Sequence, residues 1–194
     1  MLKKKKKWNW AAIIISFILI SSTFAITFFG LSSDTSTETV RKYKNYKFTR
    51  TQDGWQTDIN DKQIFFNYLP SEVETIKVDQ SIIDRLRFTP EIDVTLSIND
   101  SNADTIALAQ LQMEQILADL SLIYLRKGFD TNTSFNFPII TCNESPNVPI
   151  IYFKTSLNTS ISLYGSCIIA EGESSQDIIR LKDRIIYGIY GIIQ

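Results

Sequence analysis

The chain has 194 residues with 20 basic and 21 acidic side chains, and it contains no histidine. The lack of histidine excludes Ser-His-Asp and Cys-His nucleophile systems and the usual zinc hydrolase sites. Five of the basic residues are the consecutive lysines Lys3–Lys7, so the rest of the chain carries a net charge of about −6. That charge argues against nucleic acid as a partner of this part.

The N-terminal lysines are followed by an apolar stretch from about Trp10 to Leu31 that contains no charged residue. A bilayer core of about 30 Å needs roughly 20 apolar residues in a helix. Lysines flank only the N-terminal side, and Trp8 and Trp10 lie where an interfacial aromatic belt would form. We therefore expect residues 1–31 to be a cytoplasmic lysine run and a transmembrane anchor, which contacts the lipid bilayer through residues 8–31.

A cleaved signal peptide is the alternative interpretation of this stretch. Such peptides have a shorter apolar core, roughly 7–15 residues, followed by a small-residue cleavage pattern that TFFGLSSDTS does not show. Under either interpretation, the remainder of the chain lies outside the cytoplasm. Residues 32–44 are expected to form a polar stalk, and residues 45–194 have the length of one exported domain.

The first part of the exported segment predicts a three-stranded β-meander. Asp53-Gly54 is typical of a tight type I′ hairpin turn, and Asn60-Asp61 indicates a second turn before the strand Lys62–Leu69. Pro70 ends that strand.

A helix start and a strand are predicted next. Ser71 and Glu74 have the spacing of a capping box, with Ser71 as the cap. The segment Val78–Pro90 gives no clear pattern. Polar and apolar residues alternate over Glu91–Ile98, which predicts a strand.

A long amphipathic helix is predicted from about Asp104 to Arg126, because its apolar residues follow a helical spacing. Lys127-Gly128 is typical of a helix end. The strand at 91–98, this helix and a strand at 137–141 are expected to form one right-handed crossover unit.

Three further strands are predicted over 149–154, 159–164 and 166–170, and a final helix follows to about Tyr190. Ser174 and Asp177 are interpreted as the capping box of that helix. The predicted fold class is α+β: an N-terminal transmembrane helix, then a mixed sheet with an N-terminal meander, one long amphipathic helix and a C-terminal helix.

Cys142 and Cys167 are the two cysteines of the chain. An even pair in an exported protein predicts a disulfide bond. A reactive thiol pair is the alternative, but the spacing is not Cys-x-x-Cys. Two cysteines without histidine cannot complete a tetrahedral zinc site.

Asp100, Asn102 and Asp104 match the first three ligand positions of an EF-hand calcium loop. Thr105 replaces the next glycine and Leu111 replaces the final glutamate, so a polar strand-to-helix turn is the preferred interpretation. Carboxylate catalysis would need a pair of facing acids. The residues considered for such a pair are Asp93, Asp100, Asp104, Glu171 and Glu173. No catalytic residue and no cofactor is expected.

Four Asn-x-Ser/Thr triplets lie in predicted loops of the exported segment. They begin at Asn99, Asn132, Asn143 and Asn158. Such triplets are acceptors for N-linked glycans in exported proteins, although a chain rich in Asn, Ser and Thr also produces them by composition.

Several stretches resemble a loose group of uncharacterised archaeal proteins that have one N-terminal anchor and a small exported domain. They are FFNYLPSEVETI, PIITCN followed by VPIIYFK, and CIIAEG followed by DRIIYGIYGI. The resemblance implies an anchor, an outward domain and a bridge between Cys142 and Cys167. It implies no reaction, so no catalytic residue is transferred.

The sequence thus predicts a single-pass membrane protein with a cytoplasmic N-terminus and a non-enzymatic outer domain that binds or scaffolds an unknown surface or envelope protein. The alternative hypothesis is an envelope-facing hydrolase that uses carboxylates, with Ca²⁺ as an assisting ion.

Overall fold

The computed structural model describes residues 39–121, 123–143 and 147–194. The predicted transmembrane helix and most of the predicted stalk over 32–44 lie outside these residues. In the described ranges, no helix combines the length and apolar character needed to cross a bilayer. Residues 40–194 belong to one structural unit.

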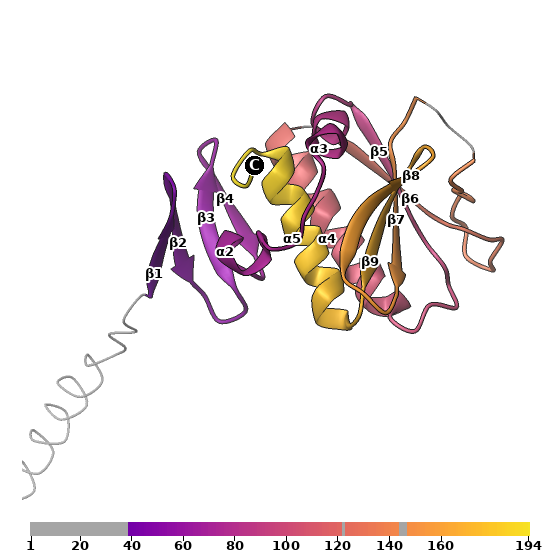
Figure 1. Ribbon diagram of the computed structural model, residues 1–194, viewed down its shortest axis with the longest axis horizontal. Coiled ribbons are helices and arrows are strands. Elements are labelled where there is room, and N and C mark those ends of the chain that lie inside the picture. Colours follow the sequence, from indigo (N-terminus) through magenta and orange to yellow (C-terminus); the bar gives the residue numbers. More distant parts are fainter. Residues whose placement is uncertain (1–38, 122, 144–146) are drawn as a thin grey trace, which may run out of the picture. The chain divides into compact units, whose positions relative to one another are not determined.

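Two β-sheets enclose a layer of helices in this unit (Figure 1). The described helices are α2 (Pro70–Val73), α3 (Gln80–Arg87), α4 (Ala103–Ser121) and α5 (Ser175–Ile189). The α+β class is confirmed. The meander, however, forms a sheet of its own and is not part of the mixed sheet, because α4 and α5 lie between the two sheets.

The first sheet, which we call the meander sheet, has four antiparallel strands in chain order. They are β1 (Val40–Tyr43), β2 (Tyr46–Arg50), β3 (Trp55–Ile59) and β4 (Lys62–Phe66). The predicted meander is therefore present with one additional strand, β1, which lies inside the segment expected to be stalk.

The turns of the meander sheet differ from the prediction. Asn60 and Asp61 have φ values of 51° and 61°, as a two-residue type I′ turn requires. The prediction of the same turn at Asp53-Gly54 is wrong, since Thr51 N–H donates to the Gly54 carbonyl at 2.9 Å across a longer loop. Gly54 is needed for space: a Cβ there would lie 2.3 Å from the Phe66 carbonyl oxygen.

The second sheet, which we call the mixed sheet, has the strand order β6-β5-β7-β9-β8. Its strands are β5 (Glu91–Leu96), β6 (Tyr124–Phe129), β7 (Ile150–Thr155), β8 (Ser160–Tyr164) and β9 (Cys167–Gly172). The four strands β6, β5, β7 and β9 run parallel to one another, and β8 is antiparallel to β9. The predicted strands at 91–98, 149–154, 159–164 and 166–170 are confirmed to within a few residues.

The prediction that α4 continues to Arg126 is wrong. The helix ends at Ser121, and the chain returns directly as β6, parallel to β5. The crossover unit is therefore β5-α4-β6, and the predicted strand at 137–141 forms only one bridge, between Ile139 and Phe129. Gly128 is not a helix cap: a Cβ there would lie 2.5 Å from the Pro138 carbonyl oxygen, which passes close to the strand.

Helix α5 begins as predicted, since the Ser174 hydroxyl accepts a hydrogen bond from the Asp177 N–H. The apolar residues predicted to line its buried face are buried: Ile178, Leu181, Ile185 and Ile189 on the helix and Ile192 just after its end. Three consecutive charged residues of α5, Lys182–Arg184, are also buried, because the helix lies between the sheets and has almost no face left for solvent.

The short helix α2 has Leu69 as its cap residue, and the Glu72 carboxylate accepts a hydrogen bond from the Leu69 N–H at 2.6 Å. The prediction of Ser71 and Glu74 as a capping box is therefore wrong by two residues. The unassigned segment Val78–Pro90 contains α3, whose Ile82, Ile83 and Leu86 are buried.

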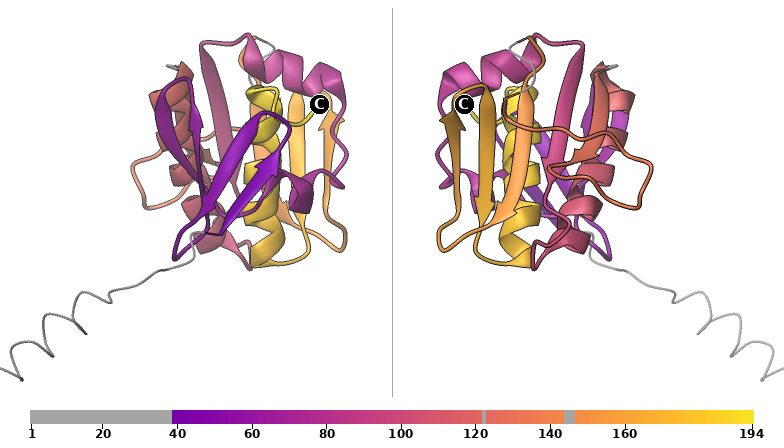
Figure 2. Two further views of the ribbon diagram at one scale, coloured as in Figure 1. Left: turned by 90° about the vertical axis from the view of Figure 1, so that its left-hand side faces the viewer. Right: turned by 90° about the vertical axis from the view of Figure 1, so that its right-hand side faces the viewer.

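The outer face of the mixed sheet carries a small second core. Cys142 and Cys167 are bonded to each other there, with Cα atoms 5.2 Å apart, as predicted. Ile140, Ile150 and Ile169 pack around this bond. The disulfide thus fastens the segment that follows β6 onto β9, on the outer face of the mixed sheet, which faces the viewer in the right-hand view of Figure 2.

Candidate functional site

A polar network closes the edge of the mixed sheet where β5 and β7 end, which is where ligands bind in many α/β proteins. Asp100 accepts hydrogen bonds from the Asn102 N–H at 2.8 Å, the Thr155 N–H at 2.8 Å and the Thr155 hydroxyl at 2.5 Å. The Ser175 hydroxyl donates to the Asn102 side-chain oxygen at 2.6 Å. Burial alone would raise the pKa of Asp100, but these hydrogen bonds hold it below its ordinary value.

The EF-hand-like residues do not come together as a ligand set. Asp100 and Asn102 belong to the polar network, whereas Asp104 is exposed in the first turn of α4. Among the described residues, no three His, Cys, Asp or Glu side chains are grouped so that they could hold a metal ion. The bond from the Asn102 N–H to Asp100 is that of a strand-to-helix turn, and the other bonds tie this turn to Thr155 on β7 and to Ser175 at the start of α5.

The other acids considered for catalysis are engaged or isolated. Arg126 donates to both carboxylate oxygens of the buried Asp93, at 2.7 and 2.5 Å. The Lys154 ammonium, 3.0 Å from Glu171, holds the pKa of that carboxyl below its usual range. Glu173 is exposed. A lowered pKa keeps a carboxyl ionised near neutral pH, whereas a general acid must hold its proton there.

The fully buried Lys182 and Asp183 form a structural joint between α5 and the end of β4. The Lys182 ammonium lies 2.5 Å from Asp183 Oδ1 and donates to the Asn67 side-chain oxygen at 3.1 Å. Asp183 Oδ2 accepts the N–H groups of Asn67 and Tyr68 at 3.0 and 2.8 Å. Burial raises the pKa of Asp183. The hydrogen bonds of this pair connect α5 to the residues after β4. Because both side chains are buried, the pair cannot contact a substrate.

Two hollows of about 460 and 470 Å³ lie on the surface of the unit. The first contains the acids Asp53 and Glu72, which are both exposed, and Glu72 already accepts the Leu69 N–H. The second is lined by Lys77 and Arg180 and by no acid in the part of the chain that the structure describes. Neither hollow presents the buried, facing carboxylates that acid–base hydrolysis needs.

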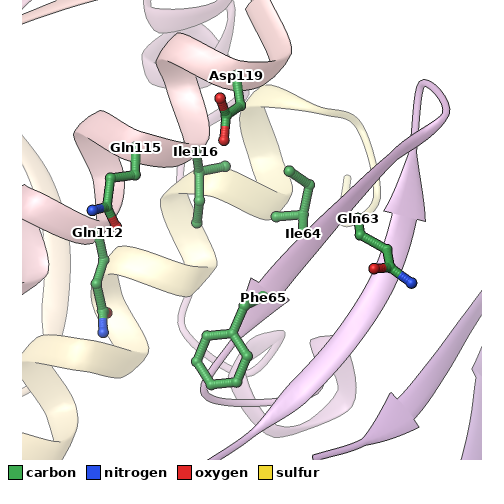
Figure 3. A pocket seen from close by; sticks show the side chains of 7 residues that line it. All are labelled: Gln63, Ile64, Phe65, Gln112, Gln115, Ile116 and Asp119. Carbon is green, nitrogen blue, oxygen red and sulfur yellow. The ribbon is translucent and has the colours of Figure 1, made fainter.

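A groove between β4 and α4 is the site with the clearest binding chemistry (Figure 3). It encloses about 190 Å³, less than the 300–1,000 Å³ typical of small-molecule pockets. Ile64 on β4 and Ile116 on α4 point toward each other at its floor. Gln112, Gln115 and Asp119 line the α4 side, and Gln63 and Phe65 line the β4 side. We call this site the β4 groove.

Within the described ranges, β4 is the last strand of its sheet, so its outer edge has no neighbouring strand. Ile59 and Lys62 flank the two-residue turn and form a hydrogen-bonded pair with each other. Such pairs alternate along an antiparallel ladder, so Ile64 and Phe66 also bond to β3. The N–H and C=O groups of Gln63 and Phe65 therefore point away from β3, toward the groove.

The α4 side of the groove is matched to an extended chain. Gln112, Ile116 and Asp119 lie on one helix face that spans about 10 Å. Three residues of a β-strand also span about 10 Å. The Gln112 side-chain oxygen is buried with no hydrogen-bond partner in the described ranges.

Two of the other three sheet edges, those of β1 and β6, are better protected against pairing, and the third is the outer edge of β8. Basic side chains on and beside β1 charge that edge, among them Arg41, Lys42 and Lys44. Phe129 at the end of β6 exchanges backbone hydrogen bonds with the 138–140 segment, at 3.1 and 2.8 Å. On β4, the Lys62 ammonium donates to the Asp119 carbonyl of α4, at one end of the groove.

Sequence reasoning did not find the β4 groove. It predicted the strand at Lys62 to Leu69 but could not show that this strand is the last of its sheet or that α4 lies beside it. The useful signal was the Asn60-Asp61 turn, which sets the register and therefore which backbone groups face outward.

The four predicted glycan acceptors Asn99, Asn132, Asn143 and Asn158 are all exposed. No protein-family model, no curated protein and no solved structure matches this chain.

Proposed function

We propose that this chain is a membrane-anchored, extracytoplasmic and non-enzymatic binding module, which captures an extended segment of a surface or envelope protein at the β4 groove. The anchor and orientation are supported by Lys3–Lys7 and the uncharged stretch after them. Both agree with the resemblance to single-anchor archaeal proteins. The observation that carries the binding function is the open β4 edge, whose chemistry matches a β-strand.

The occupant is defined by the hydrogen bonds that the edge offers. The outward N–H and C=O groups of Gln63 and Phe65 supply two donors and two acceptors at a two-residue repeat, which only an extended backbone matches. Four such bonds contribute about 2–6 kcal/mol before the loss of translational freedom is counted. Affinity of this kind is weak, and membrane anchoring compensates by raising the local concentration of the module.

The alternative hypothesis of a Ca²⁺-assisted hydrolase gains no support from the acids that motivated it. Asp93, Asp100 and Glu171 are paired or capped, and Asp104 and Glu173 are exposed. We therefore do not propose a second function.

The test uses Gln63→Pro with Gln63→Ala as its matched control. Proline removes the N–H of Gln63, which points away from β3, whereas alanine keeps it. Solubilised full-length protein should capture a membrane partner as wild type and as Gln63→Ala, and should lose it as Gln63→Pro. The Gln63 and Phe65 amides should then exchange more slowly in the complex than in the free protein.

Equal capture by all three proteins, or capture without protection of these two amides, would show that the partner binds elsewhere. If Gln63→Pro instead abolishes a dimer of the chain, seen by light scattering, the occupant of the edge is a second copy.

A further inference from the structure

Three of the Asn-x-Ser triplets occupy equivalent places in the mixed sheet. Asn99 lies three residues after the end of β5 at Leu96, and Asn132 lies three residues after the end of β6 at Phe129. Asn158 lies three residues after the end of β7 at Thr155. All three asparagines are exposed, and the loops that hold them are fully described through the third residue of each triplet.

These three positions lie along one edge of the sheet. The strands β6, β5 and β7 are neighbours and run parallel, and Leu96 is paired with Phe129. Neighbouring strands are about 4.8 Å apart, so their carboxyl ends form a continuous row. Helices α4 and α5 also begin at this edge, which is the lower end of the mixed sheet in Figure 1.

The meander sheet has no such acceptors. Asn45, Asn60 and Asn67 belong to its turns and ends, but none has Ser or Thr two residues later. The β4 groove is also remote from the row, because Gln112 lies nine residues into α4 from its start at Ala103, about 13 Å along the helix axis.

We propose that Asn99, Asn132 and Asn158 form a row of N-glycan acceptor sites, whose glycans cover the carboxyl edge of the mixed sheet and leave the meander sheet and the β4 groove uncovered. The inference rests on the extracytoplasmic placement in the proposed function. In the reaction, the asparagine Nδ2 bonds to the anomeric carbon of a lipid-linked saccharide. The bond from that carbon to the lipid phosphate breaks, its electron pair leaves with the phosphate, and Nδ2 loses one proton.

The timing of the modification differs along the row. The hydroxyl groups of Ser101 and Ser134 belong to exposed residues, whereas the Ser160 hydroxyl donates to Glu171 in the folded sheet, at 3.1 Å. The triplet at Asn158 is therefore accessible mainly before β8 pairs with β9. A co-translational assay is needed to sample all three sites.

The experiment is translation of the full-length chain in the presence of endoplasmic reticulum microsomes, with Asn143→Gln in every variant. Gel mobility should show two or three glycan additions, and Asn99→Gln, Asn132→Gln and Asn158→Gln should each remove the addition at that site. Peptide mass spectrometry should locate each glycan on the expected asparagine.

The matched control is Lys47→Thr, which places an acceptor triplet at the exposed Asn45 on the meander sheet. If Asn45 is modified and fewer than two asparagines of the row are, the row is refuted while the placement of the domain stands. If neither Asn45 nor the row is modified, the extracytoplasmic placement itself is overturned, and the glycan row falls with it.

Discussion

Replacing Lys182 with methionine tests whether the buried pair on α5 holds the meander sheet to the rest of the unit. Methionine preserves the length of the apolar stem but removes the ammonium that lies 2.5 Å from Asp183 Oδ1. The Asp183 carboxylate would then be a fully buried charge with only the Asn67 and Tyr68 N–H groups as partners.

The expected loss of unfolding free energy is about 3–5 kcal/mol, the usual effect of removing one partner from a buried ion pair. The double variant Lys182→Met, Asp183→Asn removes both charges and keeps one acceptor for the backbone N–H groups. Its loss of unfolding free energy should be about 2 kcal/mol smaller than that of the single variant, because it lacks mainly one hydrogen bond.

The effect should also depend on pH. Burial raises the pKa of Asp183 above its ordinary value of 3.8, and the lysine opposes that rise. A raised carboxyl pKa means that the stabilising contribution of the neutral form is complete below about pH 4 and is lost as pH rises through the folded-state pKa. Lys182→Met should therefore lose more stability at pH 7 than at pH 4.

Urea unfolding of the full-length protein in mild detergent, followed by circular dichroism at pH 4 and pH 7, measures both effects. A loss below about 1 kcal/mol at pH 7 would contradict the reasoning. So would additive losses in Lys182→Met, Asp183→Asn and the double variant, because additivity would mean that the two charges do not interact.

Three further predictions concern the mixed sheet. The double variant Cys142→Ala, Cys167→Ala should lose about 2–5 kcal/mol in urea unfolding, since the bond closes a loop over a sequence separation of 25; an unchanged midpoint would contradict this. Gly128→Ala should lose about 1–3 kcal/mol in the same assay, because its Cβ would meet the Pro138 carbonyl at 2.5 Å, and full stability would show that this segment can move aside. Burial and the hydrogen bond to Asp130 raise the pKa of Tyr152 to about 12, so the stability from its neutral phenol, complete below pH 10, should fall as pH rises toward 12. Tyr152→Phe should show a smaller decline over that range, and an identical decline would contradict the assignment.

Local patterns were sufficient for several elements of this fold. The capping residues Ser174 and Asp177, the type I′ turn at Asn60-Asp61 and the pairing of the two cysteines each depend on neighbouring residues or on compartment. The strands β7 and β9 were also predictable, because turn residues bound their apolar runs. The cap and the turn form from neighbouring residues, so sequence alone determines them, whereas the disulfide was predictable only because the chain has two cysteines.

The tertiary structure decided what depends on contacts between distant segments. Tyr124–Phe129 has a helical spacing that continues that of α4, yet it forms β6, because the open edge of β5 offers a full ladder of hydrogen bonds. Lys182–Arg184 would lie on a solvated face of an ordinary surface helix, and they are buried here because a second sheet covers that face. The β4 groove likewise exists only because α4 comes to lie beside the last strand of the meander sheet. A sequence specifies the pattern of each element, but burial and edge exposure arise from how the elements pack, which no single segment contains.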